Sequence, residues 1–170
     1  MSEELVRTEP RFMGFQGGAY QGAFPPVVER QIKMLVSSPC LHLFSGSSKI
    51  GDVRVDLAHP NATVHQDVYQ FLQEDRRDWA WVLLDPDYAV SRKHLKLSGH
   101  ARTDSVSGNV LAQRLLQDYL RLHADNVLWF DLCSPKPDGF ERADFWAFLP
   151  GGYKSIRALT WLKRSGERLA

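Results

Sequence analysis

The chain has 170 residues, of which 44% are hydrophobic and 24% charged, as expected for one soluble globular domain with a single core. Its formal net charge of +1 is weaker than the basic bias of proteins that hold duplex nucleic acid by charge alone. No apolar run approaches the roughly 20 residues of a membrane-spanning helix, and the acidic, polar N-terminus does not resemble a signal peptide. Cys40 and Cys133 lack metal-ligand spacing and are too few for a disulfide scaffold, so we expect buried, reduced cysteines in a cytoplasmic protein without a metal.

The first half of the chain predicts a helix followed by short strands. Residues 1–24 form a Gly- and aromatic-rich arm that we expect to be loop-like, ahead of a single domain at 25–170. Pro25 and Pro26 open a predicted helix that ends at Ser37-Ser38-Pro39, because proline fits the first helical turn. Strands are predicted at 40–46 and 53–57, with only residues 47–52 between them. That connection is short for a parallel crossover.

The second half predicts alternating helices and strands. We expect a strand at 62–67, a short helix at 68–77 and a central strand that begins at Trp79, is apolar on both faces and stops at Asp85-Pro86. A loop at 91–106 leads to a helix at 107–124, and a strand at 126–135 and an antiparallel hairpin at 143–164 close the chain. The helix is predicted to place one face inward, made of Leu111, Leu115, Tyr119 and Leu122. This alternation predicts an α/β fold with a mainly parallel sheet.

Polar residues stand at four successive strand ends, where parallel sheets bind ligands. The first strand ends at Ser45-Gly46-Ser47, where a missing side chain lets a ligand approach the backbone. The second ends at Asp56, suited to a ribose diol, and the third at Asp67, suited to an adenine amine. The fourth ends at residues 85–88, with sequence DPDY. Each feature alone also fits an ordinary turn or cap, and the ordered set of four favours a binding site.

In this order the segments LHLFSGS, VRVDL and VLLDPDY resemble motifs of the S-adenosylmethionine-dependent amino-methyltransferases, and the resemblance covers roughly residues 15–164. It implies a Rossmann-like, mainly parallel seven-stranded sheet with a C-terminal antiparallel hairpin, here with a shortened first crossover. It also implies S-adenosylmethionine as cofactor. The cofactor-binding residues that it implies are Phe44, Ser45, Gly46, Ser47, Asp56, Asp67 and Tyr20.

The same resemblance implies transfer of a methyl group to an exocyclic amine, with adenine in DNA as the leading acceptor. The family's Asp-Pro-Pro-Tyr motif corresponds to residues 85–88. Asp85 and the carbonyl of Pro86 would accept hydrogen bonds from the two N–H groups of the amine, and Tyr88 would stack on a base flipped out of the DNA duplex. Alignment of the amine with the methyl group would supply most of the catalysis.

Three departures from the family pattern stand out. Asp87 replaces the second proline, which frees the backbone and adds a negative charge close to Asp85. The short first crossover nearly deletes the helix that normally follows the glycine turn. The chain also has no evident target-recognition domain: the loop at 89–106 is either a substrate lid or a long connection, and a protein partner is a possible source of recognition. In the arm, Phe15, Tyr20 and Phe24 either close over the cofactor or patch the sheet core.

These departures leave an alternative from another class: a cofactor-binding, weakly active or inactive methyltransferase-like subunit that serves a partner. Within the enzyme class, RNA bases and a protein glutamine amide remain possible acceptors. The basic stretch at 91–102 and the basic C-terminus fit either phosphate contacts or a solvated loop and tail. A nicotinamide-dependent oxidoreductase is disfavoured, because FSGSSKIG does not supply a G-x-G-x-x-G turn.

Overall fold

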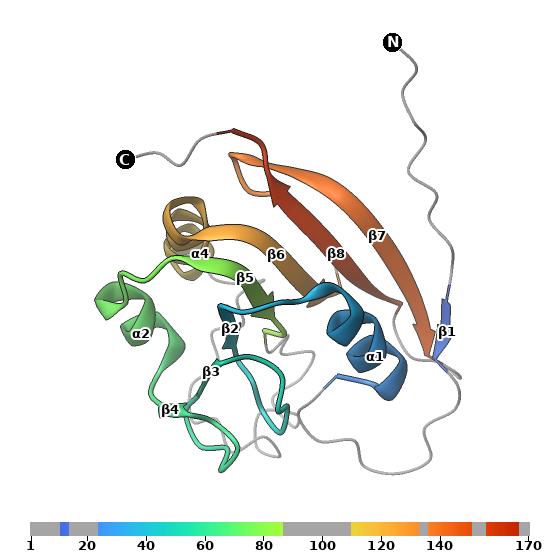
Figure 1. The fold of residues 1–170 in the computed structure, drawn as a ribbon, viewed down its shortest axis with the longest axis horizontal. Helices are drawn as coiled ribbons and strands as arrows, with labels where there is room; N and C mark the ends of the chain where they lie inside the picture. Colours follow the sequence, from blue (N-terminus) through green and yellow to red (C-terminus); the bar gives the residue numbers. More distant parts are fainter. Residues whose placement is uncertain (1–10, 14–23, 87–109, 133–135, 151–155, 167–170) are drawn as a thin grey trace.

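The computed structural model describes residues 11–13, 24–86, 110–132, 136–150 and 156–166, which form one α/β layer structure (Figure 1). The strands and helices follow one another in this order: β1 (Arg11–Met13), α1 (Pro26–Leu35), β2 (Cys40–Leu43), β3 (Val53–Asp56), β4 (Val64–His65), α2 (Val68–Glu74), β5 (Trp79–Leu84), α4 (Val110–His123), β6 (Ala124–Asp131), β7 (Phe140–Pro150) and β8 (Arg157–Arg164).

These strands form a single mixed sheet in the order β1-β7-β8-β6-β5-β2-β3-β4. Strand β8 runs antiparallel to both neighbours, β6 and β7, and the other pairings are parallel. The expected mainly parallel sheet with an antiparallel C-terminal hairpin is therefore confirmed. The sheet has eight strands rather than seven, because residues 11–13 of the arm pair with the edge of β7. Three residues held by backbone pairing leave no periodic pattern in the sequence.

The first crossover is as short as expected. Strands β2 and β3 pair in parallel, and residues 44–52 between them contain no helix. Val53 and Val55 of β3 pack toward the hydrophobic cluster that contains α2. Between them, Arg54 donates from Nε to the carbonyl of Asn61 at 2.9 Å and from its guanidinium to the carbonyl of Gly51 at 2.7 Å. Its polar contacts occupy the connecting loops, so this strand does not need a crossover helix to bury a second apolar face.

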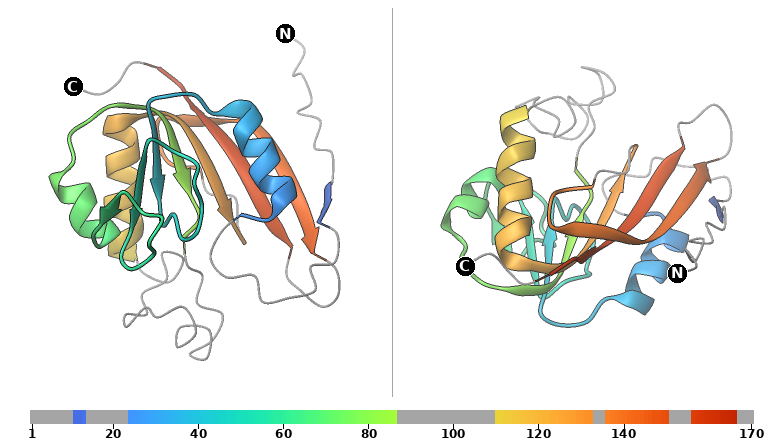
Figure 2. Two further views of the ribbon diagram at one scale, coloured as in Figure 1. Left: turned by 60° about the horizontal axis from the view of Figure 1, so that its bottom comes forward. Right: turned by 90° about the horizontal axis from the view of Figure 1, so that it is seen from above.

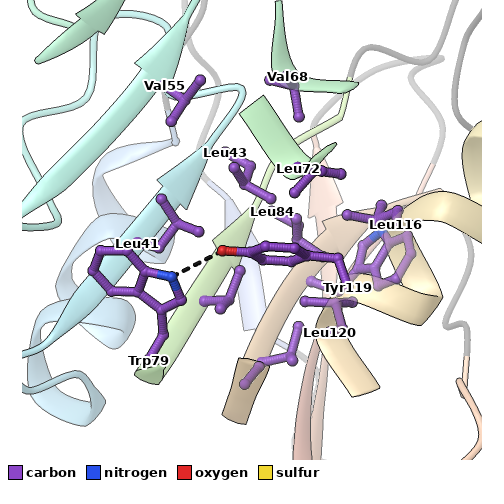
Figure 3. Close-up of a cluster of buried hydrophobic side chains, with 14 of the residues drawn as sticks. Leu41, Leu43, Val55, Val68, Leu72, Trp79, Leu84, Leu116, Tyr119 and Leu120 are labelled. Carbon is purple, nitrogen blue, oxygen red and sulfur yellow. Dashed lines mark hydrogen bonds between the residues drawn. The ribbon is translucent and has the colours of Figure 1, made fainter. Parts of the chain in front are cut away.

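Helices cover both faces of the sheet, with α1 on one side and α2 and α4 on the other (Figure 2). The apolar residues of β5 divide accordingly: Val82 and Leu84 pack with α2 and α4, whereas Trp81 and Leu83 pack with α1. Figure 3 shows the α2 and α4 side, where leucines from β2, β5, α2 and α4 meet. A central strand that is apolar on both faces, as the sequence predicted, is what two helical layers require.

The predicted inward face of helix α4 is right at Tyr119, which is buried, and at Leu115, which packs against the core, and it is wrong at the other two positions. Leu111 is 74% exposed and Leu122 is 41% exposed. The buried positions of the helix are Ala112, Leu116, Tyr119 and Leu120. Leucines lie all around this helix, so periodicity alone allowed two faces. Packing against the sheet buries Ala112, Leu116 and Leu120, and Tyr119, common to both faces, reaches a buried acid at the end of α2.

That acid is Asp75, the C-cap of α2, which ends at Glu74 rather than near residue 77. Its Oδ2 accepts a hydrogen bond from the Tyr119 hydroxyl at 2.6 Å and one from Trp79 Nε1 at 3.2 Å. The Trp79 indole N–H also lies 2.9 Å from the Tyr119 hydroxyl oxygen (Figure 3). Arg77 pairs with the other carboxylate oxygen at 2.5 Å. Burial raises the pKa of Tyr119, which stays a hydrogen-bond donor. This network joins α2, β5 and α4 at the amino edge of the sheet.

Candidate functional site

The chain order of the parallel strands reverses between β2 and β5. From β2 the chain moves outward through β3 to β4, and from β5 it moves the other way to β6. Open α/β sheets bind ligands outside the carboxyl ends of the strands at such a reversal. The arrowheads of β2, β5 and β6 point to one edge in the left view of Figure 2. The candidate site is this carboxyl edge, centred on the ends of β2 and β5.

Strand register aligns the predicted residues along that edge. Leu43 of β2 pairs with Val55 of β3 and with Leu84 of β5. The residues that follow these pairs are Phe44, Asp56 and Asp85. The structure therefore brings the predicted glycine turn, the second-strand acid and the first residue of the DPDY motif to three adjacent strand ends.

The turn after β2 is held by its own hydrogen bonds. Phe44 has a φ of 59°, which bulky residues rarely adopt, and its ring packs edge-on against Tyr69 of α2 at 6.2 Å. The backbone N–H groups of Ser45, Gly46 and Ser48 donate to Val55, Asp56 and Ser45 respectively, at 3.0–3.1 Å. These three amides do not form a phosphate cradle, and no helix N-terminus follows them within residues 44–52. The turn suits a ligand that approaches without a phosphate.

The side chain of Ser45 is the clearest sign of a missing partner at this turn. Ser45 is 1% exposed, and its hydroxyl oxygen is buried without a hydrogen bond. A buried hydroxyl in that state costs about 1–3 kcal/mol. The predicted cofactor-binding serine is thus placed at the reversal between β2 and β5, with unused hydrogen-bonding capacity. Ser47 lies in the same turn, and its carbonyl accepts from Asn61 Nδ2 at 2.8 Å.

Asp56 holds the loops on either side of it. It is buried, and its Oδ2 accepts from the N–H of Gly46 at 3.0 Å. Its Oδ1 accepts from the N–H groups of Ala58 and His59 at 3.0 and 2.9 Å. A ribose hydroxyl would have to share this carboxylate with three amides. The ribose contact stays a prediction, and the alternative that such an acid serves an ordinary turn or cap describes the hydrogen bonds of Asp56.

Asp67 lies farther from the centre of the site. It is exposed and forms the N-cap of α2, where its Oδ1 accepts from the N–H groups of Tyr69 and Gln70 at 2.9 and 3.1 Å. It follows β4, which is separated from β2 by β3. Its predicted contact with an adenine amine stays a prediction, and capping already accounts for an acid at this position.

The described part of the DPDY motif lies where the sequence placed it. Strand β5 ends at Leu84, Asp85 is half-buried and Pro86 is buried. Asp87, Tyr88 and the arm residues Phe15 and Tyr20 lie outside the described residues. Phe24 is described and is buried in the core: its ring stacks on His42 at 5.1 Å and meets Phe130 edge-on at 5.9 Å. For this arm residue, the core-patching interpretation is the one that the structure supports.

Two residues at the same edge were not singled out from the sequence. Asp131 ends β6 and is buried, two residues beyond Trp129, which is the register partner of Leu84 at the end of β5. Arg157 begins β8, and its guanidinium lies over the Phe130 ring at 5.4 Å. The signal for Asp131 was present, since it follows the apolar run VLWF as Asp56 and Asp85 follow theirs. Arg157 reaches this edge because β8 is antiparallel.

Comparison of the chain with protein-family models, curated proteins and solved structures gives no match. Within the described ranges, no group of three or more His, Cys, Asp and Glu side chains is arranged to hold a metal ion. No helix in the described part of the chain is long and apolar enough to cross a membrane. The candidate site therefore has to be interpreted from its own geometry: acids at three strand ends, an unpartnered buried hydroxyl and a turn without a phosphate cradle.

Proposed function

We propose that this protein is an S-adenosylmethionine-dependent methyltransferase that acts on an exocyclic amine, with adenine in DNA as the leading acceptor. The observation that carries the proposal is the reversal of chain order between β2 and β5, with the Ser45-Gly46 turn on one side and Asp85-Pro86 on the other. Numbered from β2, the parallel strands run 3-2-1-4-5, the order of the Rossmann class. Two of the three motifs of the family resemblance, LHLFSGS and VLLDPDY, thus end beside this reversal, where that class binds its ligands.

The chemistry of the turn supports this cofactor over a dinucleotide. A dinucleotide is held by free backbone amides and a helix N-terminus around its pyrophosphate. Here the amides of Ser45, Gly46 and Ser48 are bonded within the protein, and β3 follows the turn without a helix. S-adenosylmethionine has no phosphate and carries a sulfonium cation, which fits an edge with acids and a hydrogen-bonding serine hydroxyl. In this proposal, Ser45 and the Gly46 turn hold the cofactor.

The cofactor supplies the methyl group, and the chain supplies alignment. Asp85 and the carbonyl oxygen of Pro86 accept hydrogen bonds from the two N–H groups of the acceptor amine. The nitrogen lone pair is then directed away from these two oxygen acceptors. The carboxylate also stabilises the positive charge that develops on the nitrogen; the neutral demethylated cofactor is the leaving group, and the methylated amine loses one proton to solvent. The register between β5 and β2 brings these two oxygen acceptors close to the Ser45-Gly46 turn. Catalysis then comes mainly from holding the amine and the methyl group in the right orientation.

Substitution of Asp85 tests the assignment directly. Asp85→Ala should lower methyl transfer at least about 100-fold, as for loss of a preorganised group that stabilises developing charge, and leave cofactor affinity within about threefold. Calorimetry with S-adenosylmethionine and transfer of a tritiated methyl group to DNA and RNA measure the two quantities. Asp138→Ala, an exposed acid ahead of β7, is the matched control and should change neither. If Asp85→Ala lost cofactor affinity but retained methyl transfer, Asp85 would be a cofactor-binding residue rather than an acceptor-binding one.

The same assays separate the second candidate function. A chain that binds S-adenosylmethionine but transfers no methyl group to DNA, RNA or a glutamine-containing peptide would be a cofactor-binding partner subunit. Asp87, which stands where the family has a proline and adds a negative charge two residues after Asp85 in the sequence, is the feature that favours this alternative. For either function we expect the protein to act in the cytoplasm, together with a protein partner that supplies target recognition. A chain that binds no S-adenosylmethionine would refute both functions.

A further inference from the structure

Asp131 is a buried carboxylate at the carboxyl edge of the sheet, with 3% of its surface exposed. Its Oδ2 accepts a hydrogen bond from Trp129 Nε1 at 3.2 Å, and its Oδ1 accepts one from the N–H of Leu132 at 2.6 Å. Burial of an ionised group is costly, and an apolar side chain would complete this strand at lower cost. An acid at this place therefore calls for a role in the candidate site.

Its hydrogen-bond partner connects it to the acceptor end of β5. Trp129 is the register partner of Leu84, and both side chains belong to the same buried cluster. Leu84 is followed directly by Asp85 and Pro86. Protein interiors are close-packed, so a change in the orientation of the indole is transmitted to the residues that pack on it. The indole N–H bond to Asp131 fixes that orientation.

We propose that Asp131 is a positioning residue for methyl transfer, which holds Trp129 and through it the end of β5 that presents the acceptor groups. The inference rests on the proposed function. Asp131 does not contact the reacting atoms in this role; it sets where Asp85 and the Pro86 carbonyl stand. A displacement of about 1 Å at such groups costs on the order of 100-fold in rate.

The fold contains its own control. Asp75 and Trp79 form the same type of pair at the amino edge of the sheet, with the same distance of 3.2 Å between carboxylate oxygen and indole nitrogen. Both tryptophans are 3% exposed and both acids are buried. Loss of either pair should destabilise the protein, but only one pair adjoins the acceptor end of β5. A purely structural role for Asp131 predicts that the two pairs behave alike.

The test compares Asp131→Asn with Asp75→Asn in the full chain, at a temperature where urea titration finds both variants folded. Asparagine has one acceptor oxygen and one NH2 group, so with its oxygen on the Leu132 N–H it cannot accept from the Trp129 indole. We expect kcat for tritiated-methyl transfer to fall 10- to 100-fold in Asp131→Asn, with S-adenosylmethionine affinity within about twofold. Asp75→Asn should keep kcat within about twofold, although it lowers the urea midpoint at least as much.

Tryptophan variants extend the test in case an acid variant fails to fold. Trp129→Phe removes the indole N–H and should lower kcat as Asp131→Asn does, whereas Trp79→Phe should not. The double variant Asp131→Asn with Trp129→Phe should be no slower than the slower single variant. The reason is that both single changes remove the same interaction, the hydrogen bond between the indole and residue 131. Equal kcat losses at the two edges would overturn the inference and leave the proposed function standing. A wild-type protein without transfer activity would overturn both.

Discussion

At the residue scale, the turn after β2 combines two features that lower stability, a left-handed backbone residue and an unsatisfied buried hydroxyl. Phe44 is held at a φ of 59°, and the Ser45 hydroxyl is buried without a partner. Left-handed backbone at a non-glycine residue costs roughly 1–2 kcal/mol, and such strain is typical of ligand-binding segments. Asp56 offsets part of this cost, because it fixes Gly46 from β3. The acid that the sequence assigned to a ribose is therefore also what shapes the turn.

Asp56→Ala should reduce stability through loss of three backbone hydrogen bonds to a buried carboxylate. We expect the free energy of unfolding to fall by about 1.5–3 kcal/mol, measured by urea titration of the chain without cofactor. Asp67→Ala is the matched control, since this exposed acid also accepts from two backbone amides and a lost N-cap costs about 1 kcal/mol. Equal losses of unfolding free energy in the two variants would contradict the role of Asp56 in holding the turn after β2 to the loop after β3.

At the element scale, the C-terminus of α4 depends on a side chain from β8. The Arg164 guanidinium donates to the carbonyl oxygens of Arg121 at 2.8 Å, Leu120 at 3.2 Å and Ala124. The carbonyls of Leu120 and Arg121 belong to the last turn of α4, whose carbonyls lack partners within the helix, and that of Ala124 begins β6; a cation there also complements the helix dipole. The same guanidinium lies over the Phe140 ring at 5.3 Å. One arginine thus ends the helix and joins it to the last two strands.

Arg164→Ala should lower the free energy of unfolding by about 2–3 kcal/mol, because it leaves helix carbonyls without donors and removes a ring contact. Arg114→Ala, at an exposed position of α4, should stay within about 0.5 kcal/mol of the wild type. Chemical denaturation of both variants at the same pH measures the difference. A cost for Arg164→Ala no larger than that for Arg114→Ala would show that water replaces the guanidinium.

At the scale of the whole molecule, stability should depend on pH through a histidine inside the sheet. His42 of β2 is buried under Phe24, and its Nδ1 lies 3.0 Å from the Ile50 carbonyl oxygen, so Nδ1 carries the proton. Burial lowers the pKa of His42 to about 4; Arg54 also lowers it, and the Ile50 carbonyl and Asp56 act in the opposite direction. The folded protein therefore resists a proton that the unfolded chain accepts near pH 6.5.

Stability should be fully present above pH 6.5 and should fall as the pH drops toward 4, because only the unfolded chain binds the proton in that range. A lowering from 6.5 to about 4 corresponds to a total loss of about 3 kcal/mol. Urea titrations from pH 7.5 to 4 should show that His42→Gln removes this part of the pH dependence. The exposed residue His65, changed to Gln, is the control. A His42→Gln curve parallel to the wild type would contradict the assignment.

Sequence alone located the strand ends that matter, because their signals are local. Apolar runs that stop at Ser45-Gly46, Asp56 and Asp85 can be recognised without knowledge of the neighbours. The same signal marked Asp131 and was not used. Local patterns also sufficed for the short first crossover and the antiparallel C-terminal hairpin, since connection length and apolar alternation belong to contiguous residues.

Contacts between distant segments were decided only by the tertiary structure. The inward face of α4 depended on which leucines met the sheet and on the hydrogen bond from Tyr119 to Asp75, 44 residues away. The role of Asp56 depended on a turn that folds back onto it, and β1 depended on a free edge of β7. The order of the strands, which places Asp85 beside the Ser45 turn, likewise depends on pairing between remote segments. Local pattern indicates which segments form helices and strands, whereas burial and backbone pairing across the chain decide where each one ends and what it faces.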